Sequence, residues 1–189
     1  KGPAGQHGIC REQANSMVVD WDRGFVYVHV PKTGGSSIQA AIRPKRPGEL
    51  LKLRRKLGLP VPISFAAISP RTKHETYEEW LANFERRTGR SRAEAMRLVP
   101  ILFSRHPVAR FASLHRYLLK KHRQTYPEVP EDIDAFAAQL RDGQEAYLGR
   151  IISLQPQVTF LPKEVTPELG RFENLEADFK RIFGKFGIH

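Results

Sequence analysis

The chain has 189 residues, a length that suits one domain with a sizeable hydrophobic core. Its 31 Lys and Arg residues exceed its 20 Asp and Glu residues, so the formal net charge is +11, and 40% of the residues are hydrophobic. This composition excludes a chain that is disordered throughout and favours an anionic partner: nucleic acid, an acidic glycan, an anionic membrane or a phosphorylated cofactor. Because Cys10 is the only cysteine, an intrachain disulfide and a cysteine-based zinc site are excluded.

The sequence of the N-terminal part of the chain predicts an arm and, after it, the first elements of a folded domain. We expect residues 1–24 to form an N-terminal arm and residues 25–189 to form a single domain. The run 25–30 is rich in Val and aromatic residues and predicts a strand. Leucines at helical spacing over 49–57 predict a helix with a cationic face, and residues 62–68 predict a short strand. The cationic face could guide an acidic substrate, although a solvated surface is the simpler explanation.

The rest of the chain alternates predicted helices and strands. In chain order these are a helix over 77–84, a strand over 99–103, a helix with Phe111, Leu114, Leu118 and Leu119 on its apolar side, helices over 132–142 and 144–153, strands over 157–161 and 169–172, and a final helix. The final helix is expected to turn Leu175, Phe179 and Phe183 to the core and to end at Gly187. This alternation predicts an α/β fold with a mainly parallel central sheet flanked by helices.

A glycine-rich turn follows the first predicted strand. Its residues are Pro31, Lys32, Thr33, Gly34, Gly35, Ser36 and Ser37. Glycines let backbone amides approach an anion, and the start of the next helix offers unpaired N–H groups and a positive dipole end. The lysine precedes the glycines, unlike the order of the nucleotide-triphosphate loop. The turn therefore predicts a site for a phosphate- or sulfate-like group; a basic connecting turn without a ligand is the alternative.

A second basic turn follows the predicted strand over 99–103. Arg105 lies at the strand end, Pro107 suits the first helical position, and Ser113 lies about 9 Å further along the helix. A guanidinium and a hydroxyl can bind one phosphate together, and a structural ion pair of Arg105 is the alternative. Because both turns follow parallel strands, we expect them at the same edge of the sheet. Two anion sites there indicate a ligand with two separated anionic groups, such as a nucleotide with 5′ and 3′ phosphates.

These segments resemble the sulfotransferases. The turn over 31–37 resembles their 5′-phosphosulfate loop, residues 103–113 resemble their 3′-phosphate motif, and residues 171–179 look like their late segment. The nearest relatives by this resemblance are the bacterial and Golgi carbohydrate-type sulfotransferases. The resemblance implies a P-loop-like sulfotransferase fold and the donor 3′-phosphoadenosine 5′-phosphosulfate (PAPS), with 3′,5′-bisphosphoadenosine (PAP) as product and no metal. It also implies in-line transfer of a sulfuryl group to a hydroxyl of a carbohydrate or glycan.

The resemblance also assigns roles to residues. Lys32 would contact the phosphosulfate and neutralise the leaving phosphate, and the amides of Thr33 to Ser37 would hold the 5′-phosphate. Arg105 and Ser113 would hold the 3′-phosphate, and Arg110 would support the site. The expected cofactor-binding residues are Lys32, Thr33, Gly34, Gly35, Ser36, Ser37, Arg105 and Ser113, and the expected catalytic residues are Lys32 and His74.

The acceptor hydroxyl needs a base, and His74 is the candidate. It lies in a Lys-His-Glu-Thr segment similar to one between the two cofactor motifs of these enzymes, and histidine titrates near neutral pH. A surface or capping histidine is the alternative reading. Glu75 is the second candidate base. His29, expected within a strand, and His106, where relatives often carry Asp or Asn, are less attractive.

Other functions remain open at this point. The acceptor could be acidic, as the net charge favours, or it could be a small alcohol, a phenol or a peptide tyrosine. A basic nucleic-acid-binding module would use the same cations, and a nucleotide kinase would need a different loop order and a magnesium ligand. We expect no nucleic-acid partner, no membrane span in this chain, and a bacterial cytoplasmic location in preference to the Golgi lumen. Members of the family usually continue further, so a C-terminal segment that helps to cover the cofactor would lie beyond residue 189.

Overall fold

A four-stranded sheet forms the centre of the molecule. The computed structural model describes residues 17–42, 74–148 and 151–189, with only the backbone described for 144–148. The strands are β1 (Met17–Asp20), β2 (Phe25–Val28), β3 (Val99–Ser104) and β4 (Glu168–Arg171), and they lie in that order across the sheet. β1 pairs antiparallel with β2, whereas β2, β3 and β4 are parallel. The α/β class and the mainly parallel sheet are therefore confirmed, with one antiparallel pair at an edge.

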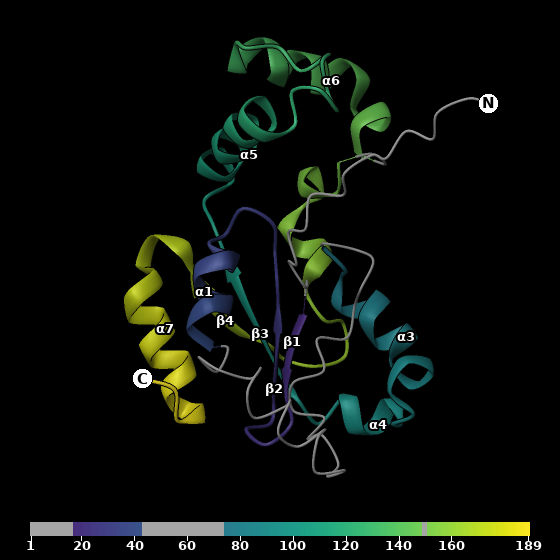
Figure 1. Ribbon diagram of the computed structural model, residues 1–189, viewed down its shortest axis with the longest axis vertical. Helices are drawn as coiled ribbons and strands as arrows, with labels where there is room; N and C mark the ends of the chain where they lie inside the picture. Colours follow the sequence, from purple (N-terminus) through teal and green to yellow (C-terminus); the bar gives the residue numbers. More distant parts are fainter. Residues whose placement is uncertain (1–16, 43–73, 149–150) are drawn as a thin grey trace, which may run out of the picture.

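Helices cover both faces of the sheet. The α-helices are α1 (Gly35–Ile42), α3 (Tyr77–Thr88), α4 (Arg92–Ala95), α5 (Pro107–Lys121), α6 (Ile133–Leu148) and α7 (Leu175–Phe183). Short 3₁₀ helices are η2 (Ile152–Leu154), η3 (Gln157–Phe160), η4 (Phe172–Asn174) and η5 (Gly184–Phe186). In Figure 1, α1 and α7 lie on one side of the sheet, α3 and α4 on the other, and α5 and α6 stand beyond the end of β3.

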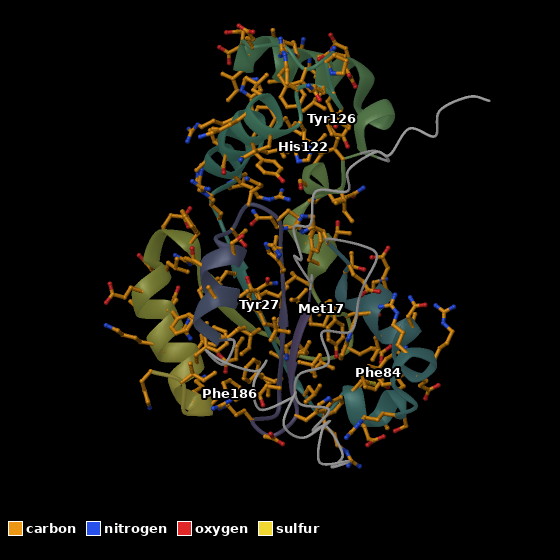
Figure 2. The ribbon with its side chains drawn as sticks, viewed as in Figure 1. Met17, Tyr27, Phe84, His122, Tyr126 and Phe186 are labelled. Atoms are coloured by element: carbon orange, nitrogen blue, oxygen red, sulfur yellow. The ribbon has the colours of Figure 1, made fainter. Side chains whose placement is uncertain are left out.

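The hydrophobic core follows from side-chain alternation in β2. All four β2 residues are buried, because successive side chains point to opposite faces and both faces are covered. Phe25 and Tyr27 pack with residues of α1 and α7, whereas Val26 and Val28 pack with residues of α3. A third cluster joins α5 to α6. Figure 2 labels one residue in or near each of the three clusters: Phe84 on α3, Phe186 after α7, and Tyr126 between α5 and α6.

Most predicted elements are confirmed. The helix around 77–84, the strand at 99–103, the helix after Pro107, the strand near 169–172 and the C-terminal helix are all present. α3 begins with a capping box between Thr76 and Glu79, and Gly187 adopts φ +71 after η5. Leu175 and Phe179 pack against a core cluster that contains Phe183, as expected. The predicted helix over 49–57 and strand over 62–68 lie outside the described residues.

Two predictions of local structure are wrong, and a third is confirmed in part. β1 lies inside the predicted arm over 1–24, because Met17 and Val19 alternate into the core cluster under α3. The strand predicted at 157–161 is instead η3, because the Thr159 amide donates to the Pro156 carbonyl as in a turn. The Gln157 side chain accepts from the amide of Arg105, after the end of β3. The two helices expected at 132–142 and 144–153 are both present as the two parts of α6, which breaks at Gly143, but the second part ends at Leu148 and is followed by η2.

Candidate anion site at the carboxyl edge of the sheet

The turn between β2 and α1 has an unusual backbone. Lys32 has φ +67 and Gly34 has φ +83, so two residues of one short turn are left-handed. Lys32 is the one non-glycine residue with positive φ in the described part of the chain, a conformation that costs about 1–3 kcal/mol. The buried Thr33 hydroxyl donates to the Val30 carbonyl at 2.8 Å and fixes the turn. Such turns point successive N–H groups into one concavity, which suits an anion.

Each glycine of the turn also has a packing reason. A Cβ on Gly34 would lie 2.9 Å from the ring of Phe172 in η4. A Cβ on Gly35 would lie 1.9 Å from Nε2 of His29, at the end of β2. The amides of Ser37 and Ile38 donate to the Gly34 carbonyl and begin α1, with Ser36 and Ser37 exposed in its first turn. Because neither glycine has a side chain, the turn fits between the end of β2 and η4.

The Lys32 ammonium lies over an aromatic ring and among other cations. Its Nζ is 3.9 Å from the centroid of the Tyr117 ring on α5, a cation–π contact. Partial burial, with the positive charges of Arg105 and Arg116, lowers the pKa of Lys32. An anion placed among these three side chains would relieve their mutual repulsion.

The second turn brings Arg105 against the first. The Arg105 guanidinium donates to the Lys32 carbonyl at 3.3 Å and lies 4.3 Å from the centroid of the Phe172 ring. Its Nε is buried without a hydrogen-bond partner among the described residues. The Gln157 side chain accepts from the Arg105 amide at 2.8 Å and donates to the Arg105 carbonyl at 2.7 Å. The prediction that both basic turns lie at one edge of the sheet is confirmed.

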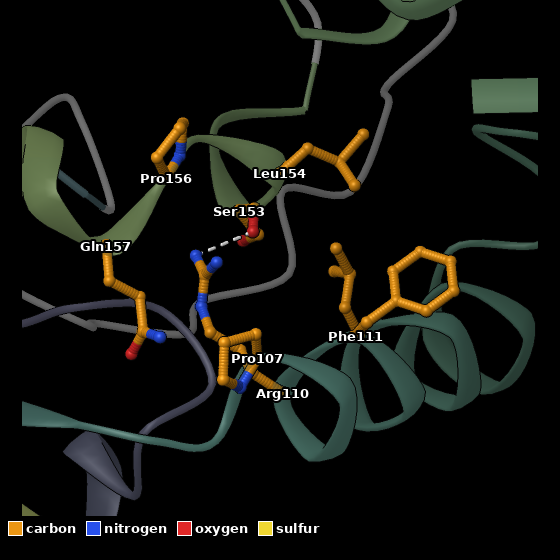
Figure 3. Close-up of a pocket in the computed structure, with 8 residues that line it drawn as sticks. Pro107, Arg110, Phe111, Ser153, Leu154, Pro156 and Gln157 are labelled. Atoms are coloured by element: carbon orange, nitrogen blue, oxygen red, sulfur yellow. Dashed lines mark hydrogen bonds between the residues drawn. The ribbon is translucent and has the colours of Figure 1, made fainter. Parts of the chain in front are cut away.

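Arg110 ties α5 to the first turn. It is buried, and its Nε donates to the Pro31 carbonyl at 3.0 Å while Nη2 donates to the Ser153 carbonyl at 2.8 Å (Figure 3). Burial lowers its pKa. Arg110 thus has the supporting place expected of it, beside a cavity of about 310 Å³ between α5 and η2–η3. Ser113 lies between Arg110 and Tyr117 at helical spacing, so it shares the face of α5 that lies along the turn.

The predicted base His74 lies beside the end of β2. Its ring centroid is 5.0 Å from that of His29, with the two planes at 70°. Glu75, the second candidate base, is buried and both its oxygens accept from Arg87, at 2.7 and 2.9 Å. Burial raises the pKa of Glu75, and the Arg87 ion pair opposes that effect. Glu75 is therefore engaged in a structural ion pair, and His74 remains the candidate base.

The two less attractive candidate histidines, His29 and His106, lie in different parts of the site. His29 follows β2 instead of lying within it, and it is 7% exposed. Burial, together with the positive charge of Lys32, lowers its pKa to about 4, so it is neutral near pH 7. His106 is exposed at the start of α5, and its amide donates to the Glu173 carboxylate at 2.8 Å.

Three cations of the site have no carboxylate partner within residues 17–42, 74–143 and 151–189. Among the described residues, none of Lys32, Arg105 and Arg116 forms an ion pair. They come from the first turn, the second turn and the middle of α5. A ligand with several negative charges would fit among them, because an uncompensated cluster of like charges is stabilised by bound anions. In the described part of the chain no group of His, Cys, Asp and Glu has the arrangement of a metal site.

Sequence reasoning missed several residues of this site. Arg116 and Tyr117 were not singled out, although no Asp or Glu occurs between Glu94 and Glu128. Their spacing of three and four residues from Ser113 is the signal that could have found them. The contacts of Phe172 and Gln157 join segments far apart in the chain, and no local pattern predicts them.

Comparisons of the chain with known protein families, with curated proteins and with solved structures found no match. No helix in the described residues combines the length and the apolar character that a membrane crossing requires.

Proposed function

We propose that the chain is a PAPS-dependent sulfotransferase with a P-loop-like fold, which moves a sulfuryl group to a hydroxyl of a carbohydrate or glycan. The observation that carries the proposal is the meeting of Lys32 and Arg105 at one sheet edge, with Arg116 beside them and no carboxylate of the described residues ion-paired to any of the three. Two strand-end cations from neighbouring parallel strands suit a donor with two anionic groups. The triad of cations also favours a highly charged nucleotide over a singly charged ligand.

The residues of the site fit the two ends of that donor. The amides of Thr33 to Ser36 at the start of α1 would hold the 5′-phosphate, with Lys32 beside the bond that breaks, whereas the Ser37 amide already donates to the Gly34 carbonyl. Arg105 and Ser113 would hold the 3′-phosphate. The buried Arg105 Nε, which has no partner among the described residues, is a donor ready for an acceptor oxygen. In the described part of the chain, the Arg105 guanidinium contacts a carbonyl oxygen and an aromatic ring but no carboxylate.

Residues of the chain then supply the proton transfer and the charge stabilisation. When bound, the donor supplies the sulfuryl group, which passes in line to the acceptor oxygen. His74 takes the proton of the acceptor hydroxyl, and Lys32 stabilises the negative charge that grows on the departing phosphate oxygen. Arg110 holds the turn in place through the Pro31 carbonyl.

The acceptor and location follow less directly from the site. The excess of positive charge, with Arg116 exposed beside the turn, favours an acidic glycan as acceptor. The single cysteine suits a reducing compartment, and we place the activity in a bacterial cytoplasm.

Thermal unfolding in the presence of nucleotides tests the proposal. PAP without magnesium is expected to raise the unfolding temperature, because binding to the folded state stabilises it. Stabilisation by ATP with magnesium but not by PAP would indicate a nucleotide kinase instead. Binding to DNA or RNA that falls steeply with salt, with no preference for PAP, would indicate a nucleic-acid-binding module. A screen with radiolabelled sulfate over acidic glycans, neutral glycans and small alcohols then identifies the acceptor.

A further inference from the structure

His29 is a buried titratable residue for which the proposed mechanism has no use. It is 7% exposed, and its Nδ1 has no hydrogen-bond partner among the described residues. A buried polar atom without a hydrogen bond lowers the stability of the folded state. We therefore expect the ring to have another role at this position.

The ring of His29 fills the space between the start of α1 and His74. On one side, a Cβ at Gly35 would lie 1.9 Å from Nε2 and 2.0 Å from Cδ2 of the ring. On the other side, the ring meets His74 in an edge arrangement, with centroids 5.0 Å apart. Below it lies Tyr27, with centroids 6.4 Å apart and planes at 20°. The absence of a side chain at Gly35 allows the ring to sit there.

The charges around His29 keep it neutral. Lys32 faces it from the turn, Tyr27 from β2 and His74 from the segment before α3. Burial and Lys32 hold its pKa at about 4. Near pH 7 His29 therefore adds no charge to the cation cluster and does not take up the proton that the reaction releases.

We propose that His29 is a positioning residue that fixes the His74 ring beside the Lys32 turn. This inference rests on the proposed function, in which His74 accepts the proton of the hydroxyl. The edge contact restricts rotation of the His74 ring, and the backbone of Gly35 prevents His29 from moving away. A catalytic base displaced by about 1 Å loses up to about a hundredfold in rate, so such a support is consequential.

The variant His29→Ala tests the proposal. We expect kcat to fall roughly ten- to a hundredfold, because His74 is no longer held. The affinity for PAP is expected to change little, since the Thr33–Val30 and Arg110–Pro31 bonds still hold the turn. His29→Asn is a second variant, should the first not fold; its side chain is planar but too short to reach His74, so kcat falls in the same way.

His115→Ala is the matched control. His115 is also buried, at 6% exposure, but it stacks on Phe136 and contacts the Pro130 carbonyl in the cluster between α5 and α6. Its loss is expected to lower the unfolding temperature and to leave kcat per folded molecule unchanged. An equal loss of kcat in His115→Ala would overturn the proposal, and so would a loss of PAP affinity in His29→Ala as large as the loss of kcat.

A measurement independent of activity separates this proposal from the proposed function. The ring signals of His74, assigned in histidine-labelled protein with the variant His74→Gln, report its contact with His29. We expect them to shift or broaden in His29→Ala and to stay unchanged in His115→Ala. Unchanged His74 signals in His29→Ala would overturn the positioning role. If the wild-type chain transfers no sulfate, the proposed function fails, and the ring signals still decide whether His29 holds His74.

Discussion

The two basic turns at the carboxyl edge of the sheet are built by different means. The turn after β2 depends on its backbone: Lys32 and Gly34 both have positive φ, and the Thr33 hydroxyl ties the turn to the strand end. The turn after β3 depends on side chains: Gln157 bonds to both the amide and the carbonyl of Arg105. The first turn can offer an anion several amides that no side-chain substitution removes, whereas the second offers chiefly one guanidinium.

This difference predicts different responses to mutation. In the first turn, a change of side chain should affect chemistry more than binding. In the second, removal of the guanidinium should affect binding of one particular phosphate.

Lys32→Ala should give the largest loss. We expect sulfate transfer to fall by about a hundred- to a thousandfold, because the developing charge on the leaving phosphate loses its cation. PAP should still bind, since the amides of the turn remain. Kinetics with PAPS and a titration with PAP measure the two effects. Lys120→Ala, an exposed lysine further along α5, is the control, and near-normal turnover in Lys32→Ala would remove Lys32 from the mechanism.

His74→Ala should reduce turnover by about a hundredfold, the usual contribution of a general base. The affinity for PAP should change far less, because the phosphate contacts come from other segments. Steady-state kinetics at saturating donor, beside a PAP titration, distinguish the two effects. A variant that loses PAP affinity but keeps its turnover would transfer the base role to another residue.

Because His29 is buried, the free energy of unfolding of the chain depends on pH. Its pKa is lowered from 6.5 to about 4 in the folded state, so between these values the unfolded chain binds a proton that the folded chain does not. Stability therefore falls as the pH drops from about 6.5 to 4, by roughly 3 kcal/mol at the lower end. Urea unfolding at pH 7 and pH 4.5 measures it. The fall should be smaller in His29→Asn; an equal fall in both proteins would show that other groups cause it.

Arg105→Ala tests the second turn. Affinity for PAP should fall roughly ten- to a hundredfold, the value of charge-assisted hydrogen bonds to one phosphate. Affinity for a nucleotide without the 3′-phosphate should change little. Calorimetric titrations with both nucleotides provide the comparison, and Arg97→Ala, an exposed arginine before β3, is the control. Equal losses for the two nucleotides would refute the assignment of Arg105 to the 3′-phosphate.

Gly35→Ala tests the packing of the first turn, with an effect on stability and not on donor chemistry. The added methyl group would meet the His29 ring at 1.9 Å, and the ring must shift to accommodate it. We expect a loss of about 1–3 kcal/mol in the free energy of unfolding, typical of overpacking. Gly143→Ala in α6 is the matched control, because nothing lies within 4 Å of its added Cβ. Equal denaturation midpoints for the two variants would argue against the tight contact.

The local pattern of apolar residues predicted the site residues that directly follow a strand. Lys32 and Arg105 could be placed at one edge because each follows an apolar run, and parallel strands bring such positions together. The strand predicted at 157–161 failed because tertiary contacts override propensity there: Gln157 bonds to the backbone of Arg105, and Val158 is exposed. β1 was missed because a four-residue strand carries little periodic signal.

Contacts between distant segments account for the rest. The ion pair of Glu75 with Arg87 joins the start of α3 to its last turn, and only the helix length places them together. The packing of Phe172 on Gly34 and on Arg105 depends on how β4 ends beside the first turn. These contacts decide which candidate residues are available for chemistry, and no spacing in the sequence records them.

One donor molecule is expected to bridge the two turns. Titration of PAP into isotope-labelled protein, followed through the amide signal of Gly35 and the Nε–H signal of Arg105, tests it most directly. We expect both signals to shift together and to yield the same dissociation constant. A response of one signal alone, or two different dissociation constants, would contradict it.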